Sequence, residues 1–198
     1  MILPDRREAG RRLAARCAHL RAERPVVLGV TRGGVPVARE VALALGAPLD
    51  VLVVAKVRDP HHPELGLGAV AEAGVVVRND RTIAAVGADA AAVDRAVHAA
   101  RVTLDAACER YRGGREPHPL ERRCALVVDD GLATGGTAIA AVTAARRRGA
   151  SRVVLAVPVA SADAAARLAA HVDEVIALEV PPVFHAVGEW YEDFSPTE

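Results

Sequence analysis

The sequence predicts an α/β fold with a parallel sheet of about five strands and helices on both of its faces. Short apolar runs alternate with longer segments of helical periodicity along most of the chain. Strands that are apolar on both sides must be covered on both sides, which is typical of parallel sheets. The chain has 198 residues, of which 52% are hydrophobic, enough for one such domain with a small appendage.

The first quarter of the chain alternates helices and strands. Residues 5–23 have the periodicity of an arginine-rich amphipathic helix, and the apolar run at 26–30 is short enough to be a buried strand. A second helix is predicted for 35–45, because Gly46 is a typical helix terminator. The apolar run at 49–55 predicts the next buried strand.

The middle of the chain is more polar and less regular. The stretch 56–68 is rich in Pro, Gly and His and is predicted to be a loop. Apolar runs on both sides of Gly74 predict a small hairpin. A long alanine-rich helix is predicted for 88–111, followed by a linker at 113–119.

The last third returns to regular alternation of strands and helices. The expected elements are, in order, 124–128, 136–148, 152–157, 162–170 and 174–178. Ligands on such sheets bind at the carboxyl ends of the strands. Three loops with unusual chemistry leave those ends, at 31–34, 56–68 and 129–137. These loops are therefore the candidate binding site.

We expect one core over residues 1–180, with a flexible lid at about 56–80 and a C-terminal hood or tail at 181–198. Four of the five aromatic residues lie in that last segment: Phe184, Trp190, Tyr191 and Phe194. Flat rings suit stacking on a planar base. They suit equally well the docking of the C-terminus onto the core or onto a partner subunit, and the sequence leaves both roles open.

Composition argues against several classes of protein. The formal net charge is zero, whereas a nucleic-acid groove needs a basic surface. No stretch of 18 apolar residues predicts a membrane span, and the charged N-terminus does not resemble a signal peptide. The three cysteines are widely separated and lack metal-binding spacing, which favours a reduced, cytoplasmic setting.

The segment 127–137 carries the most distinctive chemistry. An acid pair, Asp129 and Asp130, stands at the end of an apolar strand, and a glycine-containing turn then leads into a helix. Free N–H groups at such a helix start, together with the helix dipole, favour a phosphate, and Thr134 and Thr137 add hydroxyl donors. Carboxylates accept hydrogen bonds from sugar hydroxyls. The combination predicts a sugar phosphate as ligand.

The common nucleotide-binding loops fit this segment less well. A nucleotide P-loop needs a lysine where this chain has Gly136, and the dinucleotide pattern G-x-G-x-x-G is absent. A plain strand–turn–helix with capping threonines does not account for the acid pair and the Thr-Gly-Gly-Thr turn occurring together in this order.

The residues Val127-Val128-Asp129-Asp130-Gly131-Leu132-Ala133-Thr134-Gly135-Gly136-Thr137 resemble the phosphoribosyl diphosphate (PRPP) motif of type I phosphoribosyltransferases, in the form seen in adenine-using members. The overall pattern is similar to the stand-alone predicted phosphoribosyltransferase branch of that family. The resemblance implies the sheet of that family, with Asp129 and Asp130 on the ribose 2′- and 3′-hydroxyls. It implies that the 5′-phosphate is held by Gly131, Leu132, Ala133, Thr134, Gly135, Gly136 and Thr137.

A second segment, Val30-Thr31-Arg32-Gly33-Gly34, resembles the pyrophosphate loop of the same family. Paired glycines let backbone N–H groups wrap a diphosphate, and Arg32 offers a fork of donors. The resemblance implies a strained or cis peptide bond between Thr31 and Arg32. The alternative is a simple Gly-Gly turn beside a surface arginine.

The stretch after the second strand corresponds to a mobile loop that, in this family, closes over the active site and excludes water. Lys56, the chain's single lysine, and Arg58 open it. His61, His62 and Glu64 invite comparison with a metal site. Their spacing does not bring three ligands together, so a solvated lid is favoured.

The resemblance implies transfer of 5-phosphoribose from PRPP to a nitrogenous acceptor, a purine-like base above all, with release of pyrophosphate, as in nucleotide salvage. Catalytic roles are implied for Asp129, Asp130, Arg32 and Lys56, and substrate contacts for Thr31, Gly33, Gly34, Arg58 and the turn 131–137. Mg²⁺ would accompany PRPP, and the acid pair would contact it mostly through ribose or water. A homodimer is typical of the family.

One position departs from the hypoxanthine-using members, which carry an aspartate as general base where this chain has Ala133. A base must then come from elsewhere, such as Glu64 or Glu72, or the acceptor needs none. Two alternatives stay open. In the first alternative, the chain is a PRPP-sensing regulator without turnover. In the second, it is an assembly subunit whose aromatic tail mediates dimerisation.

Overall fold

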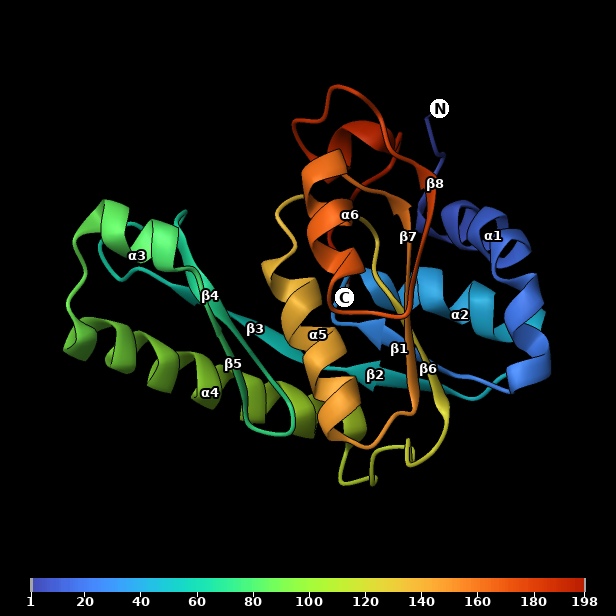
Figure 1. Cartoon of the computed structure of the whole chain (residues 1–198), viewed down its shortest axis with the longest axis horizontal. Coiled ribbons are helices and arrows are strands. Elements are labelled where there is room, and N and C mark those ends of the chain that lie inside the picture. Colours follow the sequence, from blue (N-terminus) through green and yellow to red (C-terminus); the bar gives the residue numbers. More distant parts are fainter. Residues whose placement is uncertain (1, 198) are drawn as a thin grey trace.

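The computed structural model describes residues 2–197, which form a body and a projecting arm (Figure 1). The body contains a five-stranded sheet of order β2-β1-β6-β7-β8, in which every neighbouring pair is parallel. Its strands are β1 (Val26–Val30), β2 (Leu49–Leu52), β6 (Cys124–Val128), β7 (Arg152–Val159) and β8 (Glu174–Glu179). The predicted fold class is confirmed.

Helices cover both faces of this sheet because both faces are apolar. Val26, Leu28 and Val30 pack in one cluster with α5 (Gly136–Arg147) and α6 (Ala162–Ala169). The alternate residue Val27 packs in a second cluster with α1 (Arg6–Arg16) and α2 (Gly34–Leu45). Strand residues point alternately to the two sides, so a strand with no polar residue requires two helical layers.

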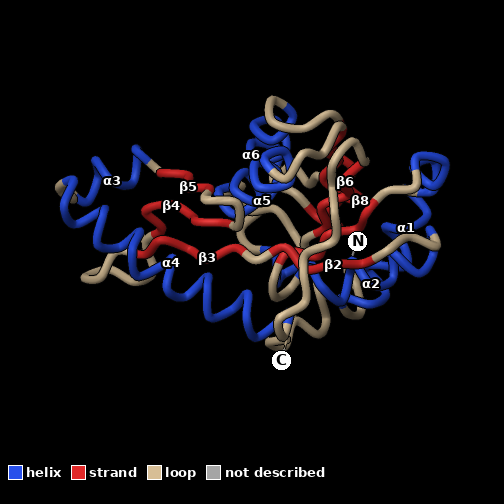
Figure 2. The backbone as a smooth tube through the Cα atoms, turned by 90° about the horizontal axis from the view of Figure 1, so that it is seen from below, coloured by secondary structure: helices blue, strands red, loops and turns tan. Residues whose placement is uncertain are grey.

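The arm is a three-stranded antiparallel sheet with two helices (Figure 2). Its elements are β3 (Val54–Arg58), β4 (Gly66–Ala71), β5 (Val75–Arg78), α3 (Asp80–Val86) and α4 (Ala90–Arg112). One side of the arm sheet packs on α4 through Ala55, Val57 and Val70. The other side packs on α5 through Ala69 and Val75. The arm therefore shares part of its core with the body.

The structure corrects two expectations for this region. The strand expected at 49–55 is divided at Val53 between two sheets, as β2 and β3. The loop expected at 56–68 is confined to 59–65, because β3 extends to Arg58 and β4 begins at Gly66. Lys56 and Arg58 alternate with buried Ala55 and Val57 on β3, and this half-polar pattern differs from that of a strand buried on both sides.

A buried ionic cluster joins the arm to the body. Arg112 at the end of α4 pairs with Glu72 (Nη1–Oε2, 2.8 Å), and Arg148 pairs with Asp50 of β2 (Nη2–Oδ2, 3.5 Å). Glu72 Oε1 also accepts a hydrogen bond from the backbone N–H of Val53 at 2.7 Å. Because these side chains are at most 15% exposed, they fix the base of the arm against the main sheet.

The two ends of the described chain lie side by side. Leu3 N–H donates to Trp190 O, and Glu192 N–H donates to Leu3 O, both at 2.8 Å. Residues 187–190 form the 3₁₀-helix η2 (Val187–Trp190), and Tyr191 is buried beside Leu3. The helix expected over 5–23 ends at Arg16 and continues as the 3₁₀-helix η1 (Ala18–Glu23).

Positions 1 and 198, the outer limits of the expected core and hood, lie outside the described residues. Within residues 2–197, no helix is both long and apolar enough to cross a membrane.

Candidate active site

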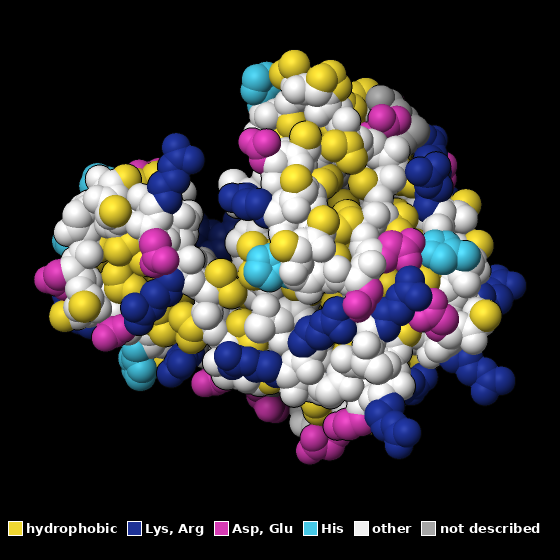
Figure 3. Space-filling view, in the orientation of Figure 1, with side chains coloured by type: hydrophobic (Ala, Val, Ile, Leu, Met, Phe, Trp, Pro, Cys, Tyr) yellow, Lys and Arg dark blue, Asp and Glu magenta, His cyan; other side chains and the backbone are white. Residues whose placement is uncertain are grey.

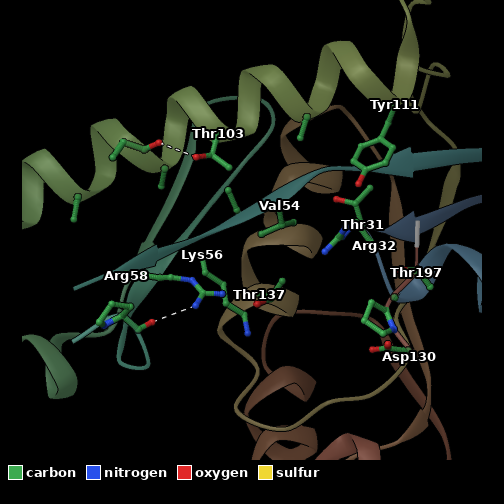
Figure 4. Close-up of a pocket in the computed structure, with 18 of the residues that line it drawn as sticks. Thr31, Arg32, Val54, Lys56, Arg58, Thr103, Tyr111, Asp130, Thr137 and Thr197 are labelled. Carbon is green, nitrogen blue, oxygen red and sulfur yellow. Dashed lines mark hydrogen bonds between the residues drawn. The ribbon is translucent and has the colours of Figure 1, made fainter. Parts of the chain in front are cut away.

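A pocket of about 1100 Å³ lies between the arm and the body. It runs along β3, one of the two edge strands of the arm sheet, and reaches the carboxyl ends of β1 and β6. Figure 3 shows the surface hollowed between arm and body, with Lys and Arg side chains at its margins. Of the residues predicted for the site, the pocket is lined by Thr31, Arg32, Gly33, Lys56, Arg58, Asp130 and Thr137 (Figure 4).

The acid pair occupies two different environments. Asp129 is partly buried and is not among the residues that line the pocket, and its Oδ1 accepts the backbone N–H of Asp130 at 2.9 Å. Its removal from water, reinforced by the charge of Asp130, raises the pKa of Asp129 well above the usual range, and the charge of Lys56 opposes this effect. Asp130 instead faces the pocket. The two carboxylates are therefore not equivalent.

Asp130 is held by both ends of the chain. Its Oδ2 accepts a hydrogen bond from Nε of Arg6 at 2.8 Å, and its backbone carbonyl accepts one from the Tyr191 hydroxyl at 2.6 Å. Burial and the nearby charge of Asp130 raise the pKa of Tyr191, so its hydroxyl stays a donor. The next residue, Gly131, lies under Val187: an added Cβ would be 2.4 Å from Cγ1 of that side chain.

The turn 131–137 is anchored to the end of β7 and to α6. Leu132 is buried and forms a bridge with Ala160, and the Ser161 hydroxyl donates to Ala133 O at 2.7 Å. Arg167 donates to Thr134 O. Gly135 has a φ of 82°, and α5 begins at Gly136 with no side-chain cap. Its first N–H groups are therefore free to bind an anion.

The loop after β1 also leads through glycine into a helix start without a side-chain cap. Its Thr31–Arg32 peptide bond is cis, one of the two forms that the family resemblance implied. The helix α2 then begins at Gly34, and its N-cap residue Gly33 supplies no side-chain cap. Because β1 and β6 are neighbours in the sheet, two uncapped helix starts lie next to each other, and the acid pair lies between them.

Lys56 and Arg58 project from β3 into the pocket (Figure 4). Arg58 donates to Pro63 O at 3.2 Å, which ties it to the loop 59–65. Asp59 also lines the pocket, and the backbone N–H groups of His61 and His62 hold its pKa below the usual range. These residues give the arm side of the pocket a net positive charge.

The two carboxylates considered as a general base do not line this pocket. Glu72 is committed to Arg112 in the buried cluster, and Glu64 is exposed beside His62, with Nδ1–Oε1 at 3.7 Å. The expectation that Glu64 or Glu72 serves as the base is therefore not supported by their positions.

Several lining residues were not predicted from the sequence, including Arg6, Asp59, Arg95 and Tyr111, whereas Phe194 was considered only as part of the C-terminal hood. Arg6 and Phe194 come from opposite ends of the chain, so no local pattern links them to the motif. Arg95 and Tyr111 lie on the face of α4 that also carries Ala99, Thr103 and Ala107, a helical spacing. Only this last signal is present in the sequence.

Within residues 2–197, no group of three or more His, Cys, Asp or Glu side chains could hold a metal ion by itself. A cation at the acid pair would therefore need further oxygen ligands from a bound phosphate compound, which is how Mg²⁺ commonly binds.

Comparisons with known proteins agree with this geometry. The family model described as "Phosphoribosyl transferase domain" matches residues 3–193. Two Mycobacterium tuberculosis proteins, "Putative phosphoribosyl transferase MT0597" (strain CDC 1551 / Oshkosh) and "Putative phosphoribosyl transferase Rv0571c" (strain ATCC 25618 / H37Rv), are each 50% identical over 196 residues. That match covers 99% of this chain but 44% of each relative, so the chain spans less than half of their length.

A solved structure extends the likeness over the full fold. The crystal structure of TT1426 from Thermus thermophilus has 46% sequence identity and a TM-score of 0.81. The match covers 99% of this chain and 93% of that one. The match to this structure therefore includes the body, the arm and the C-terminal segment of the chain.

Proposed function

Because this chain belongs to the phosphoribosyl transferase domain family, we propose that it binds PRPP in the pocket between body and arm. It transfers the 5-phosphoribose to a nitrogenous acceptor and releases pyrophosphate. One observation carries this proposal: the acid pair lies between two helix starts that lack side-chain caps, those of α2 and α5. A sugar with phosphate groups on both sides of its hydroxyls matches that order of groups.

The donor binds in three parts. The ribose hydroxyls donate to Asp129 and Asp130, and the 5′-phosphate accepts hydrogen bonds from the turn 131–137 and the start of α5. The diphosphate is wrapped by the loop 31–34, with Arg32 as a fork-shaped donor. The pocket lining by Thr31, Arg32, Gly33, Asp130 and Thr137 supports this assignment.

The arm side of the pocket supplies positive charge near the place where pyrophosphate departs. As the bond between C1 and the diphosphate breaks, negative charge grows on the pyrophosphate and positive charge on the ribose. Lys56 and Arg32 lie at the pocket wall, and cations fixed there stabilise the departing charge more than they stabilise the ground state. Placement of the donor between arm and body also limits access of water to the ribose.

The residues present fit a Mg²⁺ that arrives with PRPP, not one held by protein alone. Asp129 and Asp130 would contact it mostly through ribose or water, and the bound ion would neutralise part of the diphosphate charge.

The acceptor is a purine-like base in this proposal, and the chain offers it no carboxylate at position 133. Ala133 is exposed and its carbonyl accepts from Ser161. We assign donor binding to the core of residues 1–180 and the rim of the pocket to the hood of residues 181–198. Phe194, Pro196 and Thr197 line that rim. A homodimer is part of the proposal, and sedimentation equilibrium tests it.

The missing acid at 133 favours a second candidate, a PRPP-sensing protein without turnover. Pyrophosphate release, measured with PRPP, Mg²⁺ and a panel of purine, pyrimidine and amine acceptors, separates the two. The proposed transferase releases pyrophosphate with at least one acceptor, and Asp129→Asn with Asp130→Asn abolishes the release. Asp163→Asn, an exposed acid on α6, is the matched control. If wild type releases no more pyrophosphate than the double variant does with any acceptor, turnover is refuted.

A further inference from the structure

We propose that Arg6 is a positioning residue for the ribose end of the donor site, and that Phe194 and Ser195 hold Arg6 in place. The inference rests on the proposed function, because it concerns how Asp130 is presented to the ribose hydroxyls. It gives the aromatic C-terminal segment a role in donor binding.

Three contacts fix the Arg6 guanidinium. Nε donates to Asp130 Oδ2 at 2.8 Å, and Nη1 donates to Ser195 O at 2.8 Å. The guanidinium carbon lies 3.9 Å from the centroid of the Phe194 ring, within the range of a cation–π contact. The side chains of Arg6 and Asp130 are 11% and 15% exposed, so the pair is largely withdrawn from water.

The stability of α1 does not explain this arginine. Arg6 is the first residue of that helix, after the N-cap Asp5, and a cation in the first turn is disfavoured by the helix dipole. The next residue, Arg7, is exposed. Arg6 thus gains nothing from its helix. Its contacts lead to Asp130, to the segment 194–195 and, at 6.0 Å from the guanidinium carbon to the ring centroid, to Tyr191.

The pair leaves Asp130 able to bind a sugar. A carboxylate has about four lone-pair sites on two oxygens, and within residues 2–197 the side-chain hydrogen bond to this group uses Oδ2. Oδ1 is therefore left for a ribose hydroxyl. The planar fork of Arg6, held by three contacts, restricts rotation of the carboxylate and so prepares it for the ligand.

The same contacts account for the aromatic segment. Arg6 covers Phe194 on one side, and a Cβ added to Gly188 would lie 3.1 Å from the ring. Tyr191 packs against the ring as well, with the centroids 5.1 Å apart, and its hydroxyl binds the Asp130 carbonyl. Phe194 is 36% exposed at the pocket, and through these contacts its ring supports Arg6, which supports Asp130.

Calorimetric titration with three ligands tests this chain of contacts. PRPP with Mg²⁺ and ribose 5-phosphate carry the ribose hydroxyls, whereas inorganic pyrophosphate does not. Arg6→Gln should weaken binding of the first two roughly tenfold, since a hydrogen bond to a charged group is worth about that factor. It should leave pyrophosphate binding unchanged. Arg6→Lys should restore part of the loss, and Phe194→Leu should show the same selectivity with a smaller effect.

Two further variants make the test specific. Arg7→Gln, the matched exposed neighbour, should bind all three ligands as wild type does. In an Asp130→Asn background, Arg6→Gln should change PRPP affinity less than about twofold, because effects transmitted through one partner are not additive. Equal losses for all three ligands, or a full additional loss in the Asp130→Asn background, would overturn the proposal.

The wild-type titration separates the two levels of inference. If wild type binds PRPP and Arg6→Gln binds it equally well, the role of Arg6 is refuted and the proposed function stands. If wild type binds neither PRPP nor ribose 5-phosphate, the proposed function itself is refuted, and the role of Arg6 falls with it.

Discussion

Gly33 and Asp130 are packed so closely that a Cβ built on Gly33 would lie 1.9 Å from Oδ2 of the aspartate. The loop after β1 and the loop after β6 therefore interlock, and the same carboxylate oxygen receives the hydrogen bond from Arg6. The diphosphate loop and the ribose acids of the proposed donor site form one unit, which yields specific predictions.

Gly33→Ala should weaken PRPP binding with little loss of stability. The added methyl displaces the end of a side chain, not backbone, so the cost to folding should stay within about 1 kcal/mol. Displacing the carboxylate breaks its pair with Arg6, so we expect PRPP affinity to fall about tenfold. Calorimetry and urea denaturation measure the two effects, and unchanged affinity would contradict the prediction.

Gly34→Ala should, in contrast to Gly33→Ala, mainly lower the stability of the protein. A Cβ at this position would lie 2.5 Å from Val128 O and 2.8 Å from the Cα of Asp129, and backbone atoms of a core strand cannot easily move. We expect a loss of about 1–3 kcal/mol in the free energy of unfolding. A wild-type denaturation midpoint for this variant would show that the two loops are not rigidly packed.

Asp129→Asn should change how stability depends on pH. Burial raises the pKa of Asp129 in the folded state, so the folded protein binds more protons than the unfolded chain between the ordinary pKa of about 3.9 and the raised one. The stabilisation that comes from protonated Asp129 is therefore complete below the ordinary pKa. It is lost as pH rises through the raised pKa.

The variant lacks this titration. Its stability relative to wild type should therefore rise with pH across that window, by an amount on the order of 1 kcal/mol. Urea denaturation without ligand from pH 4 to pH 8 measures the difference, and Asp105→Asn, at an exposed position on α4, is the control. A pH-independent difference would contradict the raised pKa.

Glu72→Gln should destabilise the protein through the base of the arm. The change leaves Arg112 without its nearest counter-charge, and both side chains are at most 10% exposed. Breaking one side of a buried pair costs about 3 kcal/mol. Asp94→Asn breaks the exposed pair with Arg78 on the same arm and should cost less than about 0.5 kcal/mol. Equal effects of the two changes on thermal unfolding would refute the structural role of Glu72.

Lys56→Gln should lower the rate of pyrophosphate release more than it lowers PRPP affinity. A fixed cation that meets the growing charge of a leaving group acts mainly in the transition state, and losing one such group typically costs about 100-fold in kcat. Arg81→Gln, an exposed arginine on α3 of the same arm, should leave kcat and KM unchanged. A loss confined to KM would assign Lys56 to ground-state binding.

Local patterns in the sequence predicted the main sheet and the proposed donor loops. The expected bounds 26–30 and 124–128 are those of β1 and β6, because wholly apolar runs between turn residues have few other solutions. The arm strand β3 was missed, since its outward residues Lys56 and Arg58 are polar. A strand with one polar face is hard to tell from a loop when proline and histidine follow it.

Contacts between distant parts of the chain left no local signal. Arg6 and Asp130 are 124 positions apart. Nothing in the sequence around Arg6 distinguishes it from the other arginines of its helix as the partner of Asp130. The pairing of Leu3 with Tyr191 likewise depends on where the folded body brings the two ends together. The sequence alone therefore predicted the loops that we propose for phosphate, but not how the acid pair is held.

The most direct test of the account is calorimetric titration with PRPP and Mg²⁺ of wild type and of the Asp129→Asn, Asp130→Asn double variant. We predict saturable binding to wild type, and at least a tenfold loss in the double variant, about 1.4 kcal/mol or more, while pyrophosphate binding is kept. Absence of saturable binding to wild type, or equal affinity in the double variant, would contradict the assignment of this pocket to PRPP.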